Sequence, residues 1–138
     1  MSNDPKTYAE MANELIAGKL DPAGFSHRAH VAVAYEILTR HEVFEALALF
    51  AGGLQKLTEA AGVPEKFNAT VTFAFISLIA ARMEEQKYVD SEAFLTRNPD
   101  LLGKAVLAPY FGSEELVSNL ARKVPLMPGM AKLKPVAA

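Results

Sequence analysis

Residues 67–81, FNATVTFAFISLIAA, form the longest stretch of this sequence without a charged side chain. A helix that crosses a membrane needs about 20 predominantly apolar residues, whereas this stretch has 15 and includes four polar side chains. We therefore predict a buried helix over residues 68–86. Because its apolar side chains point to nearly every side, it is expected to lie at the centre of a helical bundle. One face carries a stripe of small residues that would let a neighbouring helix come close, namely Thr70, Ala74, Ser77 and Ala81.

Three amphipathic helices are expected before this stretch, because apolar residues recur there at intervals of three and four. Asp4 followed by Pro5 is typical of a helix start, and Ser26 is the expected cap of the second helix. Gly18 and Gly62 are suited to end the first and third helices. The expected ranges are 4–18, 26–40 and 42–62.

Two adjacent glycines, Gly52 and Gly53, lie in the middle of the expected third helix. Each glycine in a helix interior costs about 1 kcal/mol relative to alanine. Such a cost is offset most simply where another helix backbone approaches closely. The pair therefore predicts a close helix contact at this position.

The remaining third of the chain is expected to form short helices. Ser91 is the expected cap of one that ends before Asn98-Pro99, since proline disfavours helical geometry in the residue before it. A final helix is expected over residues 113–123, with acidic residues in its first turn and basic residues in its last. Prolines and a glycine make residues 125–138 an expected extended or mobile tail.

No alternating apolar pattern or hairpin signal occurs, so the fold class is predicted to be all-α. We expect one domain over residues 1–138, with an ordered core of about 4–124. Its architecture is expected to be a bundle of four main helices with short C-terminal helices.

The composition excludes several classes of function. The formal net charge of −2 gives no field that would attract nucleic acid or an anionic membrane. The absence of cysteine excludes disulfides and thiolate metal sites, and it is consistent with a reducing compartment. The N-terminus is polar and has no signal-peptide pattern, so we expect a bacterial, cytoplasmic protein. Phosphate-loop, dinucleotide and zinc-protease motifs do not occur, so no cofactor is expected.

His27 and His30 are the most informative residues for function. On a helical wheel they lie with Ala34, Leu38 and His41 on the apolar side of the second helix. They also lie in its first turn, where the helix dipole favours the neutral imidazole. One interpretation makes both histidines part of a polar pocket. In the other, one binds a backbone group and the other packs against an aromatic ring. His41 is interpreted as a satisfied helix-end residue.

The histidine pair is an incomplete metal site. Zinc takes three or four ligands, and non-haem iron typically takes two histidines and a carboxylate. Asp21, Glu84 and Glu85 are candidate third ligands, but their spacing selects none of them. We therefore expect no metal.

Four further residues are candidates for the same pocket. Asn68 is first of all the expected N-cap of the central helix. Asn68 and Thr72 lie four residues apart on one helix face, and they would contribute hydrogen bonds if that face meets the histidines. Tyr110 and Arg122 could add a phenol and a guanidinium.

Four short motifs resemble those of a family of small, uncharacterised bacterial helical proteins. Residues 25–31, FSHRAHV, resemble the Phe-x-His-x-x-His motif that opens the family pattern. Lys-Tyr-His-Glu-Thr-x-Thr, Asn-Pro-x-Leu-Leu, and Tyr-Tyr-Ser before an Ala-Arg pair then follow in that pattern. The corresponding segments here are KFNATVT (66–72), NPDLL (98–102), YFG (110–112) and AR (121–122). The resemblance covers about residues 25–128 and implies a shared fold and pocket position.

The second motif departs from the family pattern. Asn68 and Ala69 stand where the pattern has histidine and glutamate. Asparagine does not take up a proton and is a poor ligand for transition metals. The resemblance therefore does not extend to metal or acid–base chemistry at these positions.

Three functions follow from these observations. The first is a small-molecule-binding protein, or a modest enzyme that uses His27 or His30 as a general base. The second is a non-catalytic interaction protein or homodimer, with which the glycine pair and the apolar central helix are compatible. The third is a metal-dependent enzyme with the two histidines as ligands, ranked last because the ligand set is incomplete.

Overall fold

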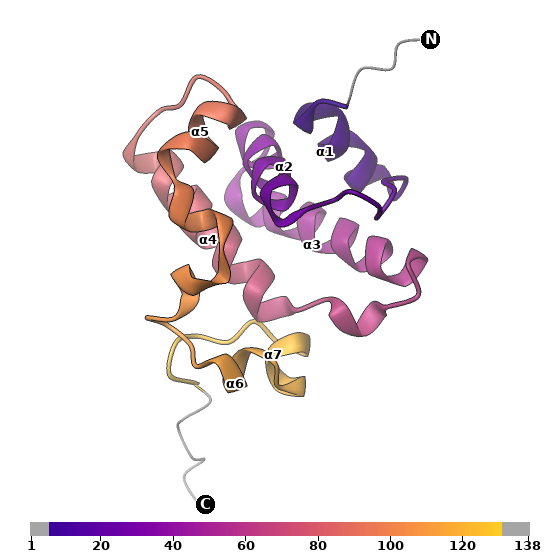
Figure 1. Cartoon of the computed structure of the whole chain (residues 1–138), viewed down its shortest axis with the longest axis vertical. Helices are drawn as coiled ribbons and strands as arrows, with labels where there is room; N and C mark the ends of the chain where they lie inside the picture. Colours follow the sequence, from indigo (N-terminus) through magenta and orange to yellow (C-terminus); the bar gives the residue numbers. More distant parts are fainter. Residues whose placement is uncertain (1–5, 131–138) are drawn as a thin grey trace, which may run out of the picture.

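The computed structural model describes residues 6–130, and over this range every regular element is helical and no strand occurs (Figure 1). This confirms the predicted all-α class. The α-helices are α1 (Tyr8–Ala17), α2 (His27–Arg40), α3 (Val43–Ala60), α4 (Ala69–Glu85), α5 (Ser91–Arg97), α6 (Ser113–Leu116) and α7 (Asn119–Lys123). Three short 3-10 helices connect them: η1 (Pro64–Lys66), η2 (Pro99–Leu102) and η3 (Lys104–Leu107).

Local capping determines most helix ends. The Ser26 hydroxyl accepts a hydrogen bond from the Ala29 N–H, as predicted for α2. The predicted start at Asp4 and Pro5 lies outside the described residues, and Thr7 caps α1 instead. Gly18 ends α1 with a φ of 73°, as expected for a left-handed C-terminal glycine.

The cap of α5 differs from the prediction by one residue. The Asp90 carboxylate accepts a hydrogen bond from the Ala93 N–H at 2.8 Å, and Ser91 is the first helical residue. Both side chains are good caps. The Ser91 side chain is buried in the helix interface, which leaves the exposed carboxylate of Asp90 to cap the helix.

The most enclosed helix is α2, which packs against α1, α3, α4 and α5 (Figure 1). Its buried residues include four consecutive alanines and valines, Val31 to Ala34, which allow neighbours to approach on several sides. The prediction that α4 is the centre is therefore wrong. Phe73 on α4 is 39% exposed, and of the predicted small-residue stripe Ser77 and Ala81 are exposed while Thr70 is buried.

The glycine pair behaves as predicted at one of its two positions. A Cβ atom on Gly53 would lie 2.6 Å from Cγ and 2.9 Å from the carbonyl oxygen of Leu15, so α1 crosses α3 at this point. A Cβ atom on Gly52 would meet nothing within 4 Å. The close approach thus requires one glycine and not two.

The predicted final helix over residues 113–123 is divided into α6 and α7. The Ser118 side chain caps α7 by accepting a hydrogen bond from the Ala121 N–H, and its own hydroxyl donates to the Glu115 carbonyl. A residue bonded in this way favours a new helix start over continuation of the old helix. The division turns α7 back toward α4, against which it packs.

The chain remains packed beyond the predicted core boundary at residue 124. Leu126 is 2% exposed, and its N–H donates a hydrogen bond to the Thr70 hydroxyl. The rest of the predicted tail, residues 131–138, lies outside the described residues.

Within residues 6–130, no helix combines the length and apolar character that crossing a bilayer requires.

Candidate functional site

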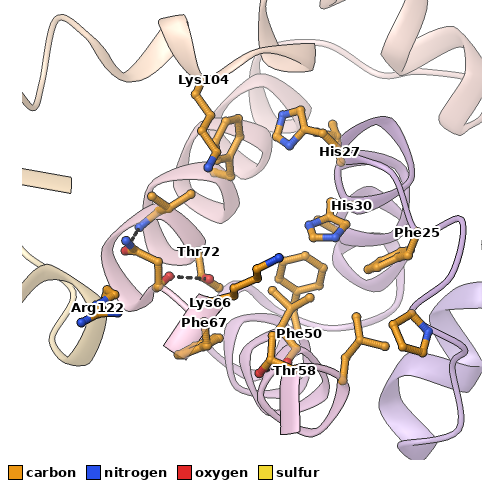
Figure 2. Close-up of a pocket in the computed structure, with 18 of the residues that line it drawn as sticks. Phe25, His27, His30, Phe50, Thr58, Lys66, Phe67, Thr72, Lys104 and Arg122 are labelled. Carbon is orange, nitrogen blue, oxygen red and sulfur yellow. Dashed lines mark hydrogen bonds between the residues drawn. The ribbon is translucent and has the colours of Figure 1, made fainter. Parts of the chain in front are cut away.

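A cavity of about 770 Å³ lies between α2, α3 and α4 (Figure 2). The segment before α4 and the start of η3 add further walls. Most of the lining is apolar and comes from the facing sides of the three helices. These apolar residues include Val31, Ala34, Phe50, Leu54, Phe75 and Ile79.

His27 lies in the first turn of α2, at one end of the cavity. Its Nε2–H donates a hydrogen bond to the Leu101 carbonyl oxygen at 2.9 Å, and its ring meets Phe75 edge-on with centroids 5.0 Å apart. Because a carbonyl oxygen only accepts, the neutral ring carries its proton on Nε2. Nδ1 is then left with a free lone pair.

His30 lies one turn further along α2, and its ring centroid is 6.4 Å from that of His27. It packs against Phe25 with the ring centroids 4.2 Å apart. Burial, followed by the positive fields of His27 and Lys104, lowers the pKa of His30 to about 4. His30 is therefore neutral at pH 7.

The contacts of the histidine pair are those of the second interpretation. One histidine binds a backbone carbonyl and the other packs against an aromatic ring, and both also line the cavity. Figure 2 shows the two imidazoles on the same wall, facing the cavity. His41 ends α2 as expected, and its Nδ1 lies 2.6 Å from a carboxylate oxygen of Glu45.

The lowered pKa of His30 predicts a loss of stability in acid. Between pH 6.5 and pH 4 the unfolded chain binds a proton at this residue that the folded chain does not. The free energy of unfolding should therefore fall by about 2 kcal/mol over this window through His30, allowing for its partial exposure. Denaturation at pH 7 and pH 4.5 measures this fall.

The variant that tests this prediction is His30→Gln. We expect the difference in unfolding free energy between pH 7 and pH 4.5 to be smaller in His30→Gln than in the unmodified protein. An NMR titration in which the His30 ring titrates near 6.5 would contradict the prediction.

Asn68 and Thr72 lie in the cavity wall, as predicted. Asn68 caps α4 by accepting a hydrogen bond from the Val71 N–H at 3.0 Å, and its amide donates to the Leu116 carbonyl. The Thr72 hydroxyl donates to the Asn68 carbonyl at 2.7 Å. The Thr72 hydroxyl and one N–H of the Asn68 amide are thus engaged within the protein, so the two residues mainly support the cavity wall.

The other two predicted residues differ in position. Arg122 lines the cavity at its edge, where its guanidinium donates to the Glu65 carbonyl and to the Asn119 side chain. Tyr110 does not line the cavity and is 46% exposed. The turn after η3 directs the next residue, Phe111, into the core, which leaves Tyr110 facing outward.

Two lysines of the lining, Lys66 and Lys104, were not among the predicted site residues. Lys66 stands two positions before the predicted residue Asn68, which is a local signal that could have indicated it. Lys104 has no such signal. It reaches the cavity because η2, which directly precedes η3, packs against α2 and brings the Leu101 carbonyl to His27.

Within the described residues, no group of three or more histidine, aspartate or glutamate side chains could hold a metal ion. Glu84 and Glu85, at the far end of α4, are exposed and do not line the cavity. Asp21 does not line it either.

Comparison with known proteins returns no match for this chain, whether among protein-family models, curated proteins or solved structures.

Proposed function

We propose that this protein binds a small, largely apolar molecule in the cavity between α2, α3 and α4. The observation that carries the proposal is the cavity itself, with a volume of about 770 Å³ and a mainly apolar lining. Small-molecule sites are typically concave, of about 300–1,000 Å³, and combine an apolar lining with a few polar groups. His27 and His30 are the polar groups on the α2 wall.

If the protein is also an enzyme, His27 is the better general base of the pair. A base works best when its pKa lies near the working pH, and the pKa of His30, about 4, is far below neutrality. The Nδ1 atom of His27 keeps its lone pair because Nε2 donates to Leu101. His30 then serves as a neutral hydrogen-bonding group.

The resemblance to the Phe-x-His-x-x-His family is consistent with this location. Residues of all four motifs lie at or beside the cavity: Phe25, His27, His30, Asn68, Thr72, Leu101 and Arg122. We infer that the shared feature is this pocket between α2, α3 and α4, within a bundle whose four longest helices are α1 to α4. Asn68 occupies the position of the family's third histidine, so we propose metal-free binding here.

A homodimer or interaction protein has less support. The glycine pair was compatible with a helix contact to a partner, but Gly53 packs against Leu15 of the same chain.

Filling the cavity tests the proposal. Ala34 is buried and lines the cavity, so the added ring of Ala34→Phe should occupy the binding space. We expect the affinity for N-phenyl-1-naphthylamine, a neutral probe that fluoresces in apolar surroundings, to fall by more than about tenfold. Because Ala34 is packed among neighbouring helices, the larger ring should also lower the melting temperature, while the helical circular dichroism spectrum at room temperature should be retained.

Ala48→Phe is the matched control, since Ala48 is exposed on α3 and does not line the cavity. It should bind the probe as the unmodified protein does. Equal probe binding by Ala34→Phe and the unmodified protein, or no binding by either, would refute the proposed function.

A further inference from the structure

The charged side chains that line the cavity have one sign. Lys66, Lys104 and Arg122 belong to the lining, and no aspartate or glutamate of the described residues does. The whole chain has a formal net charge of −2. The cavity is therefore a local concentration of positive charge in a slightly acidic protein.

Two of these cations are available to a ligand. Lys66 and Lys104 make no ion pair with any carboxylate of residues 6–130. Figure 2 shows their side chains reaching into the cavity from opposite sides, with His27 and His30 on the α2 wall between them. Arg122 is less available, because its guanidinium already donates to Glu65 and Asn119.

The N-termini of α2 and α4 add positive electrostatic potential to that of the lysines. The first turns of α2 and α4 both belong to the cavity wall, through His27 and His30 on one and Val71 and Thr72 on the other. The N-terminus of a helix carries a partial positive charge. Two such termini and two lysines thus act on the same space.

We propose that the ligand is an amphipathic anion, with an apolar body in the cavity and one anionic group, such as a carboxylate, held between Lys66 and Lys104. The inference rests on the proposed function and specifies its ligand class. The apolar body would contact the side chains of α2, α3 and α4 that form the cavity floor. Both lysines are exposed along much of their length, so the anionic group keeps part of its hydration and avoids the full desolvation penalty of a buried ion pair.

Displacement of the neutral probe by two compounds of equal chain length tests this inference. Decanoate and decanol share the apolar chain and differ in the charge of the end group. We expect decanoate to displace N-phenyl-1-naphthylamine at a concentration about five- to tenfold lower than decanol does. Added salt should reduce this preference, because it screens charges at the surface.

The double variant Lys66→Gln, Lys104→Gln should lose the preference for decanoate and bind decanol unchanged. The control is Lys19→Gln, Lys87→Gln, which removes the same charge from two exposed lysines outside the cavity. It should retain the preference.

The outcomes separate this inference from the proposed function. Equal binding of decanol and decanoate, or a preference that survives in Lys66→Gln, Lys104→Gln, would refute the anionic ligand and leave the apolar pocket intact. Failure of the probe and both compounds to bind would refute both proposals.

Discussion

Replacing Thr70 by valine is expected to lower the free energy of unfolding by about 2–4 kcal/mol, because one buried hydroxyl holds the C-terminal segment on α4. Thr70 is 1% exposed. Its oxygen lies 2.8 Å from the carbonyl oxygens of both Ala121 and Val124, and it accepts a hydrogen bond from the Leu126 N–H at 3.1 Å.

Valine has nearly the same shape as threonine but no hydroxyl. The Leu126 N–H and the Ala121 carbonyl would then be buried without partners, and each such group costs about 1–3 kcal/mol. The Val124 carbonyl is less enclosed and can turn toward water. The segment from α7 to Leu126 should therefore detach more often from α4.

Urea denaturation measures the change in stability, and limited trypsin digestion measures the detachment. Cleavage after Arg122 and Lys123 should be faster in Thr70→Val than in the unmodified protein. Thr70→Ser keeps the hydroxyl and is the control, with slow cleavage expected. A Thr70→Val protein within about 0.5 kcal/mol of the unmodified one, with unchanged cleavage, would contradict the prediction.

The two adjacent glycines of α3 are expected to respond in opposite directions to the same substitution. Gly53→Ala should lower the free energy of unfolding by about 1–3 kcal/mol, because its methyl group would overlap Leu15, including the backbone carbonyl. Gly52→Ala should raise it by about 0.5–1 kcal/mol, because nothing lies within 4 Å of the added atom and alanine favours the helix.

Urea denaturation of both variants measures these changes, and each variant is the control of the other. The two positions share the same helix and the same helix propensity, so only their surroundings differ. A stabilising effect of Gly53→Ala equal to that of Gly52→Ala would show that α1 does not cross α3 as described.

Short-range chemistry made much of this fold predictable. The caps at Ser26 and Asn68 and the stop at Gly18 depend on hydrogen bonds and dihedral angles within a few residues, so the boundaries of α2 and α4 were predicted closely. The direction of His27 and His30 was predictable for the same reason. Helical periodicity determines which side chains share the apolar face.

The errors concern contacts between distant segments. Periodicity did not distinguish α2 from α4 as the most enclosed helix, because enclosure depends on which neighbours pack around each one. Tyr110 and Phe111 are adjacent aromatic residues, and only the turn after η3 decides which of them enters the core. The separate helix α7, which Ser118 caps, was also not predicted. It packs against α4, a contact between distant segments that local periodicity does not reveal.

The sequence by itself determined the all-helical class, most helix boundaries, and the presence of two histidines on an inward face, because these follow from local propensity and spacing. The tertiary structure decided which residues surround those histidines. Lys104 reaches the cavity only through folding, because η2 must return over α2. This return brings the carbonyl oxygen of Leu101, 74 positions further along the chain than His27, to 2.9 Å from the His27 ring. The charge of the cavity depends on such long-range contacts, and local spacing carries no information about them.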